Sequence, residues 1–259
     1  MKFYRIIILS LLTILIASCS FFTTSIAKGA ARDNADRYDK LSASDLLELS
    51  SSSQVINDQK ESAKILEALG RKNNLTLLSG EQKNMVLDLM IGSTITSDSL
   101  ADAMKIIKNL ENDKELVTFF DDLLTVVSDA DTKAVVSLFN DGTSFDQMDP
   151  LSSCLTSMCI LAQAAKDEGS GKTFKDFQSV FVDVYTNSTP SDLDTPEKIE
   201  QTISKAIASN SNISEKSKDS VTAALNCAIY FKTNPARAKE IAIGNMTVDN
   251  LFDSFGKAE

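Results

Sequence analysis

Four cysteines are the side chains of this 259-residue chain with the greatest capacity for covalent chemistry. Cys19 ends an apolar run, whereas Cys154, Cys159 and Cys227 lie in the body of the sequence. The chain has no Cys-x-x-Cys spacing, which argues against a thioredoxin-like redox site. Two alternatives remain open for the last three cysteines. In the first, all three are buried thiols; in the second, either Cys154 or Cys159 forms a disulfide with Cys227.

Histidine is absent from the chain. Its absence excludes Ser-His-Asp and Cys-His catalysis, haem held by histidine, and zinc sites that use imidazole. Acid–base chemistry would depend on carboxylates, lysine or tyrosine, as in a helical enzyme that cleaves cell-wall glycan. The glutamates fall on predicted exposed faces, and Asp121 and Asp122 are neighbours that point about 100° apart on a helix. We therefore predict a protein that is not an enzyme and has no catalytic residue, cofactor or metal.

Three loops carry patterns that resemble ligand sites only in part. Gly169-Ser170-Gly171-Lys172-Thr173 matches the end of a phosphate-binding P-loop, but Lys166 stands where that motif needs a glycine, and no strand precedes it. The acids of residues 140–149 and 192–197 lack the alternating spacing of a calcium loop. We interpret all three segments as connections between helices, with the acids serving as helix caps.

Residues 1–19 have the layout of a secretory signal. Lys2 and Arg5 precede an apolar run from Ile6 to Ile16, and the run ends at Ile16-Ala17-Ser18-Cys19. This segment resembles a bacterial lipoprotein signal, whose lipobox is an aliphatic residue, a small or β-branched residue, a small residue and then cysteine. The resemblance implies cleavage before Cys19, a diacylglycerol thioether on its sulfur, and an acyl chain such as palmitate on its new amino group.

The same resemblance, which covers residues 1–19 only, also implies a cellular location for the protein. The apolar run is too short to span a bilayer, so the expected contact with the membrane is the lipid on Cys19. Ser20 stands where aspartate would retain such proteins in the inner membrane of enteric-type bacteria, which favours the outer membrane of the cell envelope. Two alternatives stay open: cleavage after Ser25-Ile26-Ala27, which would release an unanchored protein, and no cleavage.

The charge balance limits the range of partners. Loss of residues 1–18 removes Lys2 and Arg5 but no acid, so the net charge changes from −10 to −12. An acidic surface repels phosphate groups. We therefore expect no nucleic-acid partner.

A helical period of apolar residues dominates from Ser44 onward and predicts an all-α fold, either an irregular multi-helix bundle or stacked helix pairs. We divide the chain into a signal peptide (1–18), a lipidated tether (19–43) and a helical domain (44–259). Pro150, Pro196 and Pro235 each follow a capping residue and predict helix starts. Apolar residues predict helical faces in the following segments: 100–110, 116–127, 151–162, 174–184, 199–207, 221–228 and 248–255.

These features together predict a non-enzymatic helical scaffold or protein-binding module that is anchored to the membrane and binds an envelope protein. The apolar residues of Met85–Ile91 and Phe119–Val127 exceed a single helical stripe, so they are the expected sources of a docking patch if they lie at the surface. The alternative is a carrier or chaperone that holds a small apolar ligand or lipid in a cavity between helices.

Overall fold

Helices make up almost all the regular structure of the computed structural model, which describes residues 36–52, 55, 58–95, 127–169, 172–173, 175–239, 242–243 and 246–247. The longer helices are α3 (Ala43–Ser50), α5 (Gln59–Gly70), α6 (Gly80–Thr94), α10 (Pro150–Glu168), α12 (Pro196–Ala208) and α13 (Lys218–Thr233). The shorter helical segments are α2 (Asp36–Asp39), η3 (Leu75–Leu77), α9 (Lys133–Phe139), η4 (Ser144–Gln147), α11 (Lys175–Phe181), η5 (Val182–Thr186), η6 (Pro190–Asp192) and α14 (Pro235–Lys239). Two strands of two residues, β1 (Ala242–Ile243) and β2 (Met246–Thr247), pair antiparallel. The predicted all-α fold is confirmed.

Local capping signals set several helix starts. Asp149 accepts a hydrogen bond of 2.8 Å from Ser152 N at the start of α10, and Thr195 accepts one of 3.4 Å from Lys198 N at the start of α12. Each cap is followed by a proline, whose missing N–H has no helical partner to lose. Both predicted starts are confirmed.

The third predicted start differs in its cap. Helix α14 begins at Pro235 as expected, but the side chain of Asn234 donates to Tyr230 O at 2.9 Å. The backbone N–H of Asn234 also donates to Tyr230 O at 2.9 Å, so the side chain adds a second hydrogen bond at the end of α13. Its backbone carbonyl accepts the first hydrogen bonds of α14, from the backbone N–H groups of Arg237 and Ala238.

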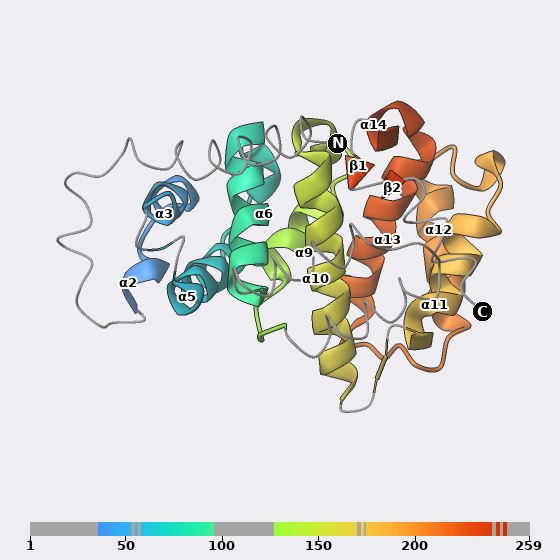
Figure 1. The fold of residues 1–259 in the computed structure, drawn as a ribbon, viewed down its shortest axis with the longest axis horizontal. Coiled ribbons are helices and arrows are strands. Elements are labelled where there is room, and N and C mark those ends of the chain that lie inside the picture. Colours follow the sequence, from blue (N-terminus) through green and yellow to red (C-terminus); the bar gives the residue numbers. More distant parts are fainter. Residues whose placement is uncertain are drawn as a thin grey trace, which may run out of the picture.

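The helices follow one another along the long axis of the molecule roughly in chain order (Figure 1). Helices α3 and α5 lie at one end, α6 and then α10 occupy the middle, and α13 separates α10 from α11 and α12. Helix α9 packs against α5, α6 and α13. Each long helix thus contacts mainly its neighbours in the series, which is the arrangement expected of stacked helices.

The buried residues of the central helix α6 cover more of its surface than the single apolar stripe of an amphipathic helix. In α6, Val86, Leu87, Met90 and Ile91 are all buried, so the apolar residues that exceed a single stripe lie inside the molecule. This helix continues through Gly92 and ends at Thr94. Because these side chains are enclosed by α5, α9 and α10, they do not provide a surface docking patch.

Several segments named above are placed differently or lie outside the described residues. Residues 36–43, which the sequence analysis assigned to the tether, pack on α5: Tyr38 is buried and its hydroxyl donates to Glu61, while Arg71 pairs with Asp39 at 2.6 Å. The predicted helical segment 174–184 is helical from Lys175, where the described part begins, but after Phe181 it widens into the π-helix η5. The stripes of residues 100–110 and 248–255 lie outside the described residues, as does that of 116–127 apart from Val127.

Candidate functional site

The predicted lipidation site, Cys19, lies outside the described residues, as do the whole lipobox and the tether up to residue 35. Cleavage and acylation therefore stay predictions from the sequence. In the part of the chain that the structure describes, no helix is both long enough and apolar enough to cross a membrane.

The connection after α10 carries the P-loop-like residues, of which Ser170 and Gly171 lie outside the described residues. Gly169 ends α10 with a φ of 106°, a left-handed conformation that glycine adopts without steric cost. Lys172 donates to Asn212 Oδ1 at 2.9 Å, and Thr173 donates to the carboxylate of Asp176 in α11. These contacts join the connection to neighbouring segments, as a loop between helices requires.

The acids of residues 140–149 diverge rather than converge. Asp141 accepts hydrogen bonds from the Thr143 and Ser144 hydroxyls at 2.8 Å each, Asp146 accepts one from the Tyr230 hydroxyl at 2.8 Å, and Asp149 caps α10. A hard cation needs several oxygens directed at one point. Within the described ranges, no group of three potential metal-binding side chains occurs.

The acids of residues 192–197 are engaged in the same manner. Asp192 accepts a hydrogen bond of 2.6 Å from the Thr189 hydroxyl, and Asp194 pairs with Lys198 at 2.8 Å. Glu197 lies in the first turn of α12, where a negative charge interacts favourably with the helix dipole. Asp149, Asp192 and Glu197 thus act at helix ends, as predicted, whereas Asp146 joins η4 to α13.

Lys83, which the sequence analysis did not single out, is the most unusual charged residue of the described chain. Its side chain is only 2% exposed, and its ammonium donates to Gln147 Oε1 at 3.0 Å. Burial tends to raise the pKa of nearby Asp141, but the hydrogen bonds from Ser144 and Thr143 and the charge of Lys83 outweigh it, so this pKa lies below its usual value. A sequence signal for Lys83 exists: it lies four and seven residues before Leu87 and Met90, on the buried face of α6.

An aromatic cluster connects η4, the segment that carries Gln147, to α13. Phe145 stacks on Tyr230 with ring centroids 5.0 Å apart and contacts Phe139 at 4.9 Å. Arg237 of α14 donates to Met148 O at 3.0 Å. Lys83, Asp141 and this cluster together hold the connection between α9 and α10 against α6 and α13, which indicates a structural role.

A second lysine missed by the sequence analysis holds the π-helix in place. Lys232 of α13 donates to the carbonyl oxygens of Tyr185 and Ser188, the latter at 2.9 Å, and its ammonium lies 5.3 Å from the centre of the Tyr185 ring. A cation at the last carbonyls of a helix is favourable, as is one near an aromatic ring. Helices with π geometry occur often at functional sites, but here the contacts of Lys232 give the widened turns a structural partner.

One carboxylate has an unusual proton affinity. The pKa of Asp88 in α6 is raised to about 6, mainly because surrounding protein replaces its hydration and also because Asp149 adds a second negative charge nearby. The Asp88 side chain nevertheless keeps contact with water. It therefore lacks the enclosed setting expected of a catalytic acid.

The three body cysteines are free thiols with no exposed surface. Burial raises the pKa of Cys154 and of Cys159 to about 12, and it raises that of Cys227 well above its usual value. A thiol in this state is a poor nucleophile. In this structure all three thiols are reduced and lie in the core, and the second arrangement left open by the sequence, a disulfide to Cys227, is not formed.

Comparison of the chain with family models, with curated proteins and with solved structures finds no match in any of the three.

Proposed function

We propose that the protein is a lipid-anchored helical module of the bacterial cell envelope that binds a protein partner and has no enzymatic activity. The observation that carries the proposal is the sequence Ile16-Ala17-Ser18-Cys19 at the end of an apolar run with a basic start. A lipidated Cys19 would fix one end of the chain to a membrane, and several acyl chains together make such an anchor stable.

The structure of the body supports a role as a scaffold or binding module. Its helices form a series along one axis (Figure 1), which presents long outer faces to the surroundings. The charged side chains that the sequence analysis considered for chemistry are engaged in helix caps, ion pairs and loop contacts within the described residues. Their arrangement is that of a framework, and its net negative charge favours a partner with a basic or neutral surface.

The docking surface has to lie on helix faces that the fold leaves exposed. The apolar residues of Met85–Ile91 lie inside the stack, so they do not supply the patch. Of the second expected source, Phe119–Val127, the structure describes only Val127, which is buried. We therefore place the partner on the outer faces of the helix series, and we expect contact through polar rims around small apolar centres.

Crosslinking in intact cells tests this proposal. The wild-type chain should enter the detergent-rich phase on extraction and should crosslink reproducibly to at least one envelope protein. The Cys19→Ser chain should lose the detergent partitioning and the crosslink, because it is no longer held at the membrane. A wild-type chain that yields no crosslinked protein but co-purifies with a lipid or other apolar molecule in mass spectrometry would overturn the proposal in favour of a carrier.

A further inference from the structure

We propose that Cys154 of α10 and Cys227 of α13 form a disulfide when the protein folds outside the cytoplasm. The proposal rests on the proposed function for its location, because disulfides persist mainly in oxidising compartments such as the bacterial periplasm. It rests on the structure for the choice of the two cysteines. The bond would join two central helices of the body whose residues are 73 positions apart.

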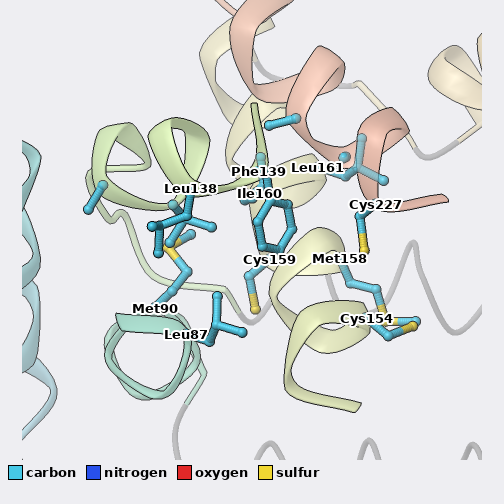
Figure 2. Close-up of a cluster of buried hydrophobic side chains, with 14 of the residues drawn as sticks. Leu87, Met90, Leu138, Phe139, Cys154, Met158, Cys159, Ile160, Leu161 and Cys227 are labelled. Atoms are coloured by element: carbon cyan, nitrogen blue, oxygen red, sulfur yellow. The ribbon is translucent and has the colours of Figure 1, made fainter. Parts of the chain in front are cut away.

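The contact between α10 and α13 brings the two cysteines together. Cys227 Sγ donates to Ser153 O at 3.7 Å, and one turn further along, Ser157 Oγ donates to Ala224 O at 3.4 Å. The Cα atom of residue 154 lies about 2.8 Å from the preceding carbonyl oxygen, so Cys227 Sγ lies within about 6.5 Å of Cys154 Cα. Figure 2 shows the Cys227 sulfur directed toward the part of α10 that carries Cys154 and Met158.

The electrostatic interaction between the two thiols agrees with this geometry. Ionisation of Cys154 is one cause, after burial, of the raised pKa of Cys227. A disulfide needs Cα atoms within about 7 Å of each other, and the contact of Cys227 with the carbonyl oxygen of Ser153 shows that α10 and α13 pack closely beside Cys154.

Cys159 lies on the other side of α10. Its thiol interacts with the side chain of Thr94 in α6, and Figure 2 shows it beside Leu87 of that helix. Helix α10 is placed between α6 and α13 (Figure 1), so it separates Cys159 from Cys227. Of the two pairings that the sequence leaves open, the structure favours Cys154 with Cys227.

The oxidation requires a disulfide donor, which we take to be an oxidised dithiol protein of the envelope. The Cys227 thiolate attacks one sulfur of the donor disulfide, forms a mixed disulfide and releases one donor thiolate. The Cys154 thiolate then attacks the Cys227 sulfur of the mixed disulfide, which forms the Cys154–Cys227 bond and releases the second donor thiolate. The donor has then gained two electrons, and it takes up the two protons that the cysteine thiols lose. Because burial raises the pKa of both thiols in the folded chain, the exchange precedes the closure of α10 on α13.

The test counts thiols in the full chain extracted from cells. The chain is denatured without reductant and treated with a maleimide that adds a fixed mass per thiol. Reduction before labelling should expose two further thiols in the wild type and in Cys159→Ala, the matched control. It should expose none in Cys154→Ala or Cys227→Ala. Reduction should also lower the Tm of the wild type but leave that of Cys154→Ala unchanged.

A second arm separates this proposal from the proposed location. The full chain is reduced, unfolded and refolded with oxidised and reduced glutathione. Failure to pair Cys154 with Cys227 in this refolded chain, or pairing of Cys159 with Cys227, overturns the disulfide. Pairing in the refolded chain but not in cells overturns the extracytoplasmic location, and the proposed function with it.

Discussion

The ammonium of Lys83 donates a hydrogen bond of 3.0 Å to the side-chain oxygen of Gln147, although the two residues are 64 positions apart. The backbones also meet here: a β-carbon on Gly80 would lie 2.7 Å from the carbonyl oxygen of Gln147. The start of α6 is therefore fitted closely to η4, and this contact determines how the connection to α10 is placed.

Gly80→Ala should destabilise the fold. The added methyl group meets a backbone oxygen at a distance that real β-carbons do not show, so the helix or η4 must shift. Overpacking of this kind costs about 1–3 kcal/mol. Urea unfolding measures the effect, and Gly142→Ala is the matched control, because a β-carbon there meets nothing within 4 Å. Equal stability of the two variants would contradict the close contact.

Lys83→Ala should cost more stability than Lys83→Met. Alanine leaves a cavity in a buried site, and replacing a large buried side chain by alanine lowers the free energy of unfolding by about 2–5 kcal/mol. Methionine keeps most of the volume and removes the cost of burying a charge, although Gln147 Oε1 loses its donor. Comparison of the two free energies of unfolding separates packing from charge. If methionine proves as destabilising as alanine, the charge opposite Asp141 matters more than the volume.

Asp149→Ala should reduce stability by about 0.5–2 kcal/mol, because Asp149 caps α10 through its hydrogen bond from Ser152 N. Glu200→Ala, at an exposed position of α12, serves as the control and should change the free energy of unfolding by no more than about 0.5 kcal/mol. Chemical denaturation of both variants measures the difference. A loss no larger than that of the control would refute the capping role.

Asp88→Asn should alter the dependence of stability on pH. The folded pKa of Asp88, about 6, is above its ordinary value of 3.8, so the folded state binds the proton more tightly. The stabilisation of the folded state that Asp88 contributes is therefore fully present below about pH 4, and it is lost as the pH rises through 6. The wild type should lose stability over this window relative to Asp88→Asn, and only by a small amount because the carboxylate keeps contact with water. Thermal unfolding at pH 4, 5, 6 and 7 measures the two curves, which would run parallel if this prediction is wrong.

Cys19→Ala should prevent lipidation. The expected result is an unprocessed precursor, or a chain that moves from the detergent-rich phase to the aqueous phase. Fatty-acid labelling and electrophoretic mobility measure the change, with Cys159→Ala as the cysteine control. Unaltered labelling in Cys19→Ala would show that the lipid, if any, is attached elsewhere.

Features set by neighbouring residues were predictable from the sequence. The helical stripes of α10, α12 and α13 and the caps at Asp149 and Thr195 depend on residues a few positions apart, and the structure confirms them. The lipobox of residues 16–19 is equally local, so the prediction of Cys19 as the lipidated residue needs no tertiary structure.

Features that join distant segments were decided by the tertiary structure alone. Nothing in the sequence indicates that Lys83 would meet Gln147, that Asp146 would accept a hydrogen bond from Tyr230, or that Cys227 would donate to the carbonyl oxygen next to Cys154. Helical periodicity states which face of a helix is buried but not which helix covers it. The packing of α10 between α6 and α13 determines these contacts, because only packing brings residues from distant parts of the chain within hydrogen-bonding distance.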